Sequence, residues 1–509
     1  MKRTLKKTND LKAKLLAHKI EINHQSFSKS ISTEEFQTAI NQFLIQRLFS
    51  FELNQKLYYA IEDKKQIIHP LPPQWRRILK SEGLKIPTIT NAIIWFFFKF
   101  KWFLYGVVLS FRVLLSNLSF FREQIDTPFV YLDNLTEKNF PADKTFDKAK
   151  NIIHWVINFH DFKSTSIIYW FKGVGSHKIL TNQIKSIPYA VTSNSINLWS
   201  FIFLCGKLVY HLIYLISKLL LSSSLSPLLM KEYGFLLILD DQKKNNLASH
   251  YYFHGSTLIF RPLWTYIVEK RESEVICFLY STHNSPYSFE GKFDLNHGYR
   301  NESSWNNFYT WNKFQKEYFA YFRPNAKFFI VGPIWFEAFK SPKINPKSNK
   351  LNILILDIRP LEKDKIKFLG MAENFNFSEE YLISYIRSLV NTLTTIEGVE
   401  IFYKSKRSFV ENFHSKNYQK AVNNIFEEKI ISNVDPNTDI FSLIQEVDII
   451  FCPPFVSAAN IAQDMNKATA YFDPSKKILP NAFLAHGNKI LYTEGEIREF
   501  VETEKYKLS

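Results

Sequence analysis

The segment at residues 453–460, PPFVSAAN, carries the most specific chemistry in the sequence. Its prolines end an apolar strand, Ser457 stands where a helix N-cap is expected, and small residues open the helix that follows. A helix N-terminus binds phosphate through its backbone N–H groups and its dipole, without a glycine-rich loop. The segment therefore predicts a phosphate site, and an ordinary capped turn between strand and helix is the alternative.

Basic residues follow two neighbouring predicted strands. Lys404 and Arg407 lie at the end of strand 399–406, and Arg359 follows strand 351–358. Parallel strands end at the same edge of a sheet, where α/β proteins bind their ligands. We expect these cations to neutralise a diphosphate, with Lys404 turned inward. Solvated loop ends are the alternative.

A third group of residues supplies candidates for a general base. His254 lies in the apolar run 250–256, and an imidazole has a pKa near neutrality, as a base acting on a hydroxyl requires. Asp240 and Glu269 are the rival catalytic residues. A single histidine is more often a structural residue, and that interpretation stays open.

Several common motifs are missing. The sequence holds only 14 glycines, and it contains neither a Walker A loop nor G-x-G-x-x-G. It also lacks a D-x-D triplet, the metal-clamping motif of metal-dependent nucleotide-sugar enzymes. These absences disfavour P-loop and ordinary dinucleotide-binding proteins, and we expect neither a cofactor nor a bound metal.

Composition limits the class of protein further. The net charge is +16, and 46% of the residues are hydrophobic, which is typical of a folded globular chain. Cys205, Cys277 and Cys452 lie in apolar runs without disulfide or zinc-site spacing and indicate a reducing compartment. The basic N-terminus lacks a signal-peptide core, and no nucleic-acid-binding signature occurs. We expect a cytoplasmic protein that does not bind nucleic acid.

Two long apolar segments favour an anionic membrane surface as a partner. Segment 91–121 is interrupted by Lys and Arg, and its polar residues form no single face. In segment 196–221, Ser200, Lys207, His211 and Lys218 share one narrow stripe, and the remaining surface is apolar. Such a helix suits a bilayer surface. The alternative is a core helix that turns its polar stripe to solvent.

The order of predicted elements indicates an α/β protein with two Rossmann-like domains facing a cleft and a helical N-terminal extension. Residues 1–90 form the basic helical extension, and 91–340 form the first domain, with short apolar strands. The segment 341–350, rich in proline and lysine, reads as a linker. Apolar strands then alternate regularly with helices through 351–509, as in a doubly wound parallel sheet.

Two motifs resemble a known family. Pro454-Phe455-Val456-Ser457 is similar to the P-F-T-S signature of the polysaccharide biosynthesis PFTS motif proteins, and 471–475, YFDPS, is similar to their Y-Y-D-P-S. The resemblance covers roughly residues 230–480 and implies a metal-independent GT-B-like glycosyltransferase. The family serine carries over to Ser457, whereas Val456 replaces the threonine and puts a side-chain phosphate contact in doubt. The aspartate carries over to Asp473 without a settled role.

These considerations give two sets of binding residues. The expected donor-binding residues are Arg359, Lys404, Arg407, Pro454, Phe455, Ser457, Ala458 and Asp473. The expected acceptor-binding residues in the first domain are Arg261, Trp264, Tyr266, Thr282 and Asn284.

The expected function is transfer of a sugar from a nucleotide-sugar donor to a lipid-linked or growing bacterial surface polysaccharide. The enzyme would be peripheral on the inner face of the plasma membrane. One alternative is a polyol-phosphate transferase of the teichoic-acid type, working from a CDP-alcohol. The other is a non-catalytic, membrane-docked assembly factor.

Overall fold

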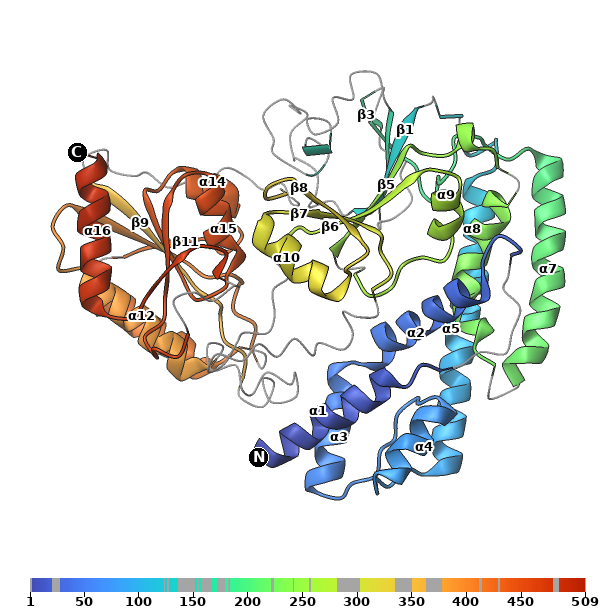
Figure 1. The fold of residues 1–509 in the computed structure, drawn as a ribbon, viewed down its shortest axis with the longest axis horizontal. Coiled ribbons are helices and arrows are strands. Elements are labelled where there is room, and N and C mark those ends of the chain that lie inside the picture. Colours follow the sequence, from blue (N-terminus) through green and yellow to red (C-terminus); the bar gives the residue numbers. More distant parts are fainter. Residues whose placement is uncertain are drawn as a thin grey trace.

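The chain folds into a helical extension and two α/β domains (Figure 1). The computed structural model describes residues 2–20, 28–122, 124–125, 128–135, 152, 155–156, 166–171, 179–181, 184–220, 224–240, 242–255, 258–281, 303–334, 350–362, 378–411, 414–428, 431–478 and 485–508.

The extension contains four short helices that pack on the first domain. They are α1 (Lys2–Ala17), α2 (Thr33–Leu48), α3 (Phe51–Glu62) and α4 (Pro73–Ser81). Ser32 and Glu35 form a capping box that begins α2. The fully buried Gln42 of α2 donates to Ser304 at 2.8 Å and accepts from the Arg261 backbone N–H at 3.0 Å. The extension is therefore fixed to the first domain.

Among the described residues, the first domain is built on an eight-stranded sheet with the order β3-β4-β2-β1-β5-β6-β7-β8, and of these strand pairs only β3–β4 is antiparallel. The strands are β1 (Phe129–Leu135), β2 (Ser166–Phe171), β3 (Ile179–Thr181), β4 (Ile184–Ser186), β5 (His250–His254), β6 (Glu274–Phe278), β7 (Asn307–Thr310) and β8 (Lys327–Ile330). The helices are α5 (Thr88–Ser116), α7 (Leu198–Leu220), η3 (Ser226–Leu229), α8 (Met230–Leu239), η4 (Lys244–Asn246), α9 (Thr265–Lys270) and α10 (Lys313–Phe322).

The second domain has a six-stranded parallel sheet with the order β11-β10-β9-β12-β13-β14. Its strands are β9 (Leu351–Leu356), β10 (Val399–Lys404), β11 (Ser432–Val434), β12 (Ile449–Cys452), β13 (Ala468–Phe472) and β14 (Lys489–Leu491). Its helices are α12 (Glu379–Leu393), α13 (Lys416–Glu428), α14 (Ile440–Gln445), α15 (Ser457–Asp464) and α16 (Glu494–Leu508). This is the Rossmann strand order. Successive strands are added on one side of β9 up to β11 and on the other side from β12 onwards, and ligands bind in such sheets at this reversal of strand order, between β9 and β12.

The two domains touch through polar and apolar contacts. The Asn312 side chain, just before α10, lies 3.0 Å from His486 Nδ1 of the second domain. Ile334 belongs to the same buried hydrophobic cluster as Phe455 and Ala459 of the second domain. The loops after β6 and β7 also line one pocket with the strand-end loops of the second sheet, and the two Rossmann-like domains predicted from the sequence are confirmed.

Two helices of the first domain are long and apolar enough to cross a membrane by length and composition. They are α5 and α7, with mean hydropathy of 1.6 in both. Only 22% of the apolar window in α5 and 17% of that in α7 are buried. Neither helix is therefore a core helix, and both lie at the side of the first domain away from the second (Figure 1).

Candidate functional site

A cavity of about 610 Å³ lies between the two domains at the strand ends of the second sheet. It is lined from the first domain by Tyr280, Ser281 and Trp311. From the second domain it is lined by Leu356, Asp357, Lys404, Lys406, Arg407, Ser408, Pro436, Asn437, Thr438, Asp439, Ile440, Phe441, Val456, Ser457, Ala458 and Ile461. The cavity volume is in the range of small-molecule sites, and we call it the interdomain pocket.

Cations line one side of the interdomain pocket. Lys404 is the last residue of β10, is 6% exposed, and donates to the Pro436 carbonyl at 2.9 Å. Burial lowers the pKa of its ammonium, and the carboxylates of Asp357, Asp439 and Asp435 act in the opposite direction. Lys404 is thus buried and lines the interdomain pocket, whereas its contact with an anion stays a prediction.

The first turn of α15, which follows β12, also lines the interdomain pocket. Val456, Ser457 and Ala458 belong to this lining, so the positive end of the helix dipole lies at the same pocket as the cations that follow β10. Phe455 adopts a positive φ of 69° and turns the chain sharply before the helix. The expected N-cap is wrong by one residue: Val456 is the N-cap, with no side-chain cap hydrogen bond, and Ser457 is the first helical residue.

A buried carboxylate that we did not predict orders the cation loop. Asp357 follows β9, is 2% exposed, and accepts hydrogen bonds from the Tyr403 and Tyr418 hydroxyls, each at 2.5 Å. It also accepts from the Lys406 backbone N–H at 3.1 Å. These contacts fix the start of the segment that carries Lys406 and Arg407. The available sequence signal was an acidic residue directly after a buried strand.

A second unpredicted stretch lining the interdomain pocket is the turn after β11. Asp439 is the N-cap of α14 and accepts from the Ser442 N–H at 2.8 Å. Asn437 and Thr438 of the same turn line the pocket. The sequence DPNTD at 435–439 has the composition of a turn that caps a helix, and this pattern was the signal available for it.

The first domain contributes aromatic and hydroxyl groups to the interdomain pocket. Trp311 follows β7, and its indole N–H donates to the Leu279 carbonyl at 2.5 Å, which orients the ring. His254 does not line the pocket: it is 6% exposed, and its ring centroid lies 5.9 Å from that of Tyr280, which does. His254 thus contacts Tyr280, which lines the pocket, without lining the pocket itself.

The other two candidate bases lie elsewhere. Asp240 ends α8, where the chain approaches the beginning of β5, and accepts from the Ser28 hydroxyl at 2.6 Å. Glu269 lies in α9 before β6, and accepts from Arg261 at 2.8 Å and from Asn306 at 3.0 Å. Both carboxylates lie near strand beginnings, the opposite edge of the sheet from the pocket. The structure therefore does not bring either carboxylate to the interdomain pocket, and a catalytic role for Asp240 or Glu269 stays a prediction.

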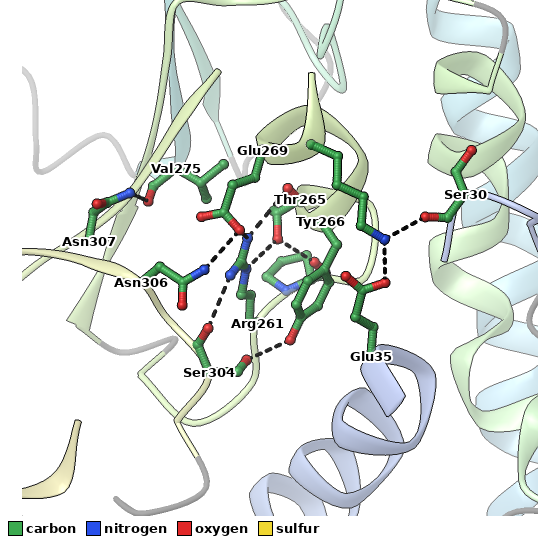
Figure 2. A network of polar contacts seen from close by, with 12 residues as sticks. Ser30, Glu35, Arg261, Thr265, Tyr266, Glu269, Val275, Ser304, Asn306 and Asn307 are labelled. Carbon is green, nitrogen blue, oxygen red and sulfur yellow. Dashed lines mark hydrogen bonds and ion pairs between the residues drawn. The ribbon is translucent and has the colours of Figure 1, made fainter. Parts of the chain in front are cut away.

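Three expected acceptor-binding residues are structural. Figure 2 shows that Arg261 lies inside a polar network, in which its guanidinium also donates to the Ser304 carbonyl at 3.0 Å. Tyr266 donates to the Ser304 hydroxyl at 2.7 Å (Figure 2), and Trp264 is 3% exposed within an aromatic cluster. None of the three lines the interdomain pocket, and their contacts with an acceptor stay a prediction. Thr282 and Asn284 lie outside the described residues.

The remaining expected donor-binding residues separate into two groups. Arg407, Ser457 and Ala458 line the interdomain pocket, as Lys404 does. Their contacts with a donor stay a prediction.

Arg359, Pro454 and Phe455 do not line the interdomain pocket. Arg359 donates instead to the Ser405 hydroxyl at 3.0 Å, and Phe455 is a buried core residue. Asp473 accepts from the backbone N–H groups of Ser475, Lys477 and Ile478 at 2.9–3.0 Å. Asp473 therefore stabilises the turn after β13 and does not line the interdomain pocket, and its role in donor binding stays a prediction.

Two Rossmann-like domains with a pocket between their strand ends define the GT-B class of architecture. Residues 213–501, more than half of the chain, match the family described as polysaccharide biosynthesis PFTS motif protein. The chain belongs to this family, as the resemblance in residues 454–457 and 471–475 indicated. In the part of the chain that the structure describes, no group of three or more His, Cys, Asp or Glu residues is placed to hold a metal ion.

Solved structures with detectable similarity are distant. One is α,α-trehalose 6-phosphate synthase from Burkholderia multivorans, with 6% identity, coverage of 75% of this chain and 88% of that chain, and a TM-score of 0.38. Another is the E. coli trehalose-6-phosphate structure bound with UDP-2-fluoro glucose, with 10% identity, coverage of 74% and 91%, and a TM-score of 0.37.

A third is an S. aureus TarM mutant in complex with Fondaparinux, α-GlcNAc-glycerol and UDP, with 10% identity, coverage of 54% and 52%, and a TM-score of 0.31. TM-scores below 0.5 carry no conclusion about function, so the architecture rests on the two sheets themselves. No curated protein matches the sequence.

Proposed function

We propose that this protein is a glycosyltransferase that binds a nucleotide-sugar in the interdomain pocket. One observation carries the proposal: the pocket is lined both by the α15 start, which follows β12, and by Lys404, Lys406 and Arg407 at the end of β10, the strands on either side of β9. A diphosphate is the group that suits both, because it carries charge for the cations and oxygens for the helix end. Membership of the polysaccharide biosynthesis family supports a sugar as the transferred group.

In this proposal the two domains have different tasks. As the sugar leaves, negative charge develops on the diphosphate, and the Lys404 ammonium with the α15 dipole would stabilise it. The acceptor hydroxyl enters from the side of Tyr280, Ser281 and Trp311 and loses its proton to a base. Among the three predicted bases, His254 alone lies next to this wall. The cations replace a metal ion in this mechanism.

The acceptor in this proposal is a lipid-linked or growing bacterial surface polysaccharide, and the site of action is the inner face of the plasma membrane. Family membership supports a polysaccharide product. Two free, buried cysteines, Cys277 and Cys452, are compatible with the reducing cytoplasm, where nucleotide-sugars are present.

A panel of nucleotides tests the proposal. UDP-, GDP-, CMP- and CDP-linked donors are added to the wild-type protein, and its melting temperature is followed, because a ligand of the native state raises it. The matched pair is Lys404→Met and Lys420→Met, since Lys420 is an exposed lysine of α13 in the same domain that does not line the interdomain pocket. We expect a sugar-linked nucleotide to stabilise the wild type and Lys420→Met, and to stabilise Lys404→Met much less.

The panel also separates the alternatives. Stabilisation by CDP-alcohols alone would favour the polyol-phosphate transferase. Stabilisation by no nucleotide would remove both enzyme functions and leave the assembly factor, for which Lys404→Met would not change polysaccharide output in cells.

A further inference from the structure

Helices α5 and α7 expose the apolar side that a core helix would bury. On α7, Trp199, Tyr210 and Leu220 are 81%, 78% and 73% exposed. On α5, the exposed apolar residues recur every three or four positions and so form one continuous face: Ile93, Phe97, Phe100, Leu104, Val108, Phe111 and Leu115. The two helices contact each other, so their apolar faces belong to one surface, which we call the α5–α7 surface.

The polar stripe of α7 identifies the orientation of this helix. In a core helix the stripe of Ser200, Lys207, His211 and Lys218 would face solvent. Instead, His211 stacks on Tyr233 with ring centroids 4.1 Å apart, so this part of the stripe packs on the domain. Soluble monomers rarely expose a large continuous apolar patch, such as the α5–α7 surface, unless it binds a partner or a membrane.

Basic residues border the α5–α7 surface. The Lys207 ammonium lies 4.6 Å above the Phe203 ring, and the Lys218 ammonium lies 5.3 Å from the Tyr214 ring. Lys101 and Arg112 are exposed beside the apolar face of α5. Long basic side chains with apolar stems at the edge of an apolar face suit anionic lipid headgroups, which attract them electrostatically. The charge therefore selects a bilayer over an apolar protein partner.

Sheet topology excludes a pair of membrane spans. Strand β1 lies between α5 and α7 in the sequence, and it pairs in parallel with β5, which follows α7, through Val130 and His250 among others. If both helices crossed a bilayer, β1 and β5 would lie on opposite sides of it, and the sheet could not form.

Packing also fastens α5 along its length. The buried Lys99 donates to the Leu219 carbonyl at 3.0 Å, and Ser110 donates to the Met230 carbonyl at 2.9 Å. A Cβ on Gly106 would lie only 2.5 Å from the Lys231 backbone nitrogen, so the two backbones are in direct contact there. Helix α5 is therefore held against the start of α8, and it could cross a bilayer only if these two helices separated.

We infer that α5 and α7 lie flat on an anionic lipid bilayer, with the α5–α7 surface among the headgroups and upper acyl chains, and that neither helix spans. Helices of about 43 Å and 34 Å, at 1.5 Å per residue, provide two contacts of the length of a small domain. The surface is independent of the interdomain pocket, so membrane binding and donor binding succeed or fail separately.

Vesicle flotation tests the lipid partner. Wild-type protein is mixed with phosphatidylcholine vesicles with and without phosphatidylglycerol, at low and high salt. The variant is Trp199→Glu with Ile213→Glu, and the matched control is Tyr321→Glu with Tyr506→Glu, since these tyrosines are 63% and 85% exposed but lie outside the surface. We expect wild type and control to float with anionic vesicles, most strongly at low salt, and the variant to remain unbound with its donor affinity intact.

Failure of the wild type to float with anionic vesicles would overturn the inference, as would equal flotation of the variant.

The orientation of α5 relative to the membrane has its own measurement. A Ser119→Cys residue, exposed after α5, is placed in a Cys205→Ser background and treated with a membrane-impermeant maleimide on intact spheroplasts. We expect labelling only after the spheroplasts are opened, whereas labelling from outside would show that α5 spans.

Discussion

Asn312 Nδ2 donates to His486 Nδ1 across 3.0 Å and joins the two domains. His486 is 1% exposed, and burial lowers the pKa of its imidazole to about 4. The ring is therefore neutral at physiological pH, as an acceptor of this hydrogen bond must be. Protonation would place a charge in the buried contact and remove the acceptor that Asn312 needs.

A pH dependence of stability follows from this pair. The folded pKa of His486 lies below its ordinary value of about 6.5, so its contribution is complete above pH 6.5 and is lost as the pH falls towards 4. The size is about 3 kcal/mol in the free energy of unfolding, measured by urea titration between pH 7 and 4.5.

The comparison variant for this titration is His486→Asn, because asparagine tolerates the positive φ of 53° at this position. Other buried histidines, such as His69 and His211, titrate in both proteins and cancel in the difference. We expect the variant to lose less stability on acidification than the wild type. If the free energy of unfolding falls equally with pH in both proteins, protonation of His486 does not weaken the domain contact.

Asp357 should be required for the shape of the cation loop. In Asp357→Asn, the amide offers one acceptor oxygen to three donors, so we expect a loss of about 1–3 kcal/mol in the free energy of unfolding. Donor affinity, measured by calorimetry, should fall as well, because the Lys406 backbone loses its partner.

Tyr418→Phe is the control for this variant, since it removes one of the hydrogen bonds to Asp357 without touching the pocket lining. It should lower stability by about 1 kcal/mol and leave donor affinity unchanged. Unaltered donor affinity in Asp357→Asn would mean that the carboxylate serves the fold alone.

Val456→Thr should stabilise the protein. Val456 is the N-cap of α15 and makes no side-chain cap hydrogen bond, whereas a threonine hydroxyl accepts one from the first turn. We expect a gain of about 1 kcal/mol in the free energy of unfolding and no loss of donor affinity. Val456→Ala is the control, because it shortens the side chain without supplying a cap. A threonine variant no more stable than the wild type would contradict the N-cap assignment.

Transfer should not depend on a divalent metal. Lys404, Lys406 and Arg407 line the interdomain pocket and supply the positive charge that the leaving diphosphate needs. The rate of sugar transfer in excess EDTA should therefore equal the rate with added magnesium. A rate that collapses in EDTA and returns with magnesium would show that the cations are insufficient.

The sequence predicted the second domain well because its signal is local. Apolar runs at 351–358, 399–406 and 447–454 became β9, β10 and β12, and the fold class is confirmed. The strands β7 and β14, of four and three residues, were missed. Their pairing with β6 and β8 and with β13, which sequence patterns do not contain, makes them strands.

The site was predictable only where a residue's position followed from strand order. Lys404 and Ser457 line the interdomain pocket because parallel strands end together. Arg261 and Glu269 looked equally suitable for chemistry, yet they bind each other at 2.8 Å inside the first domain. Asp357 was missed because its tyrosine partners come from β10 and α13, further along the chain. Partners distant in sequence decide whether a polar residue is structural or free to act.

The most direct test of the proposed function is a crystal structure of the protein with a nucleotide-sugar selected from the panel. We expect the diphosphate to lie in the interdomain pocket, within hydrogen-bonding distance of the Lys404 ammonium and of the first backbone N–H groups of α15. Tyr280 and Trp311 should then face the sugar. A nucleotide bound elsewhere, or a diphosphate that contacts neither Lys404 nor α15, would contradict it.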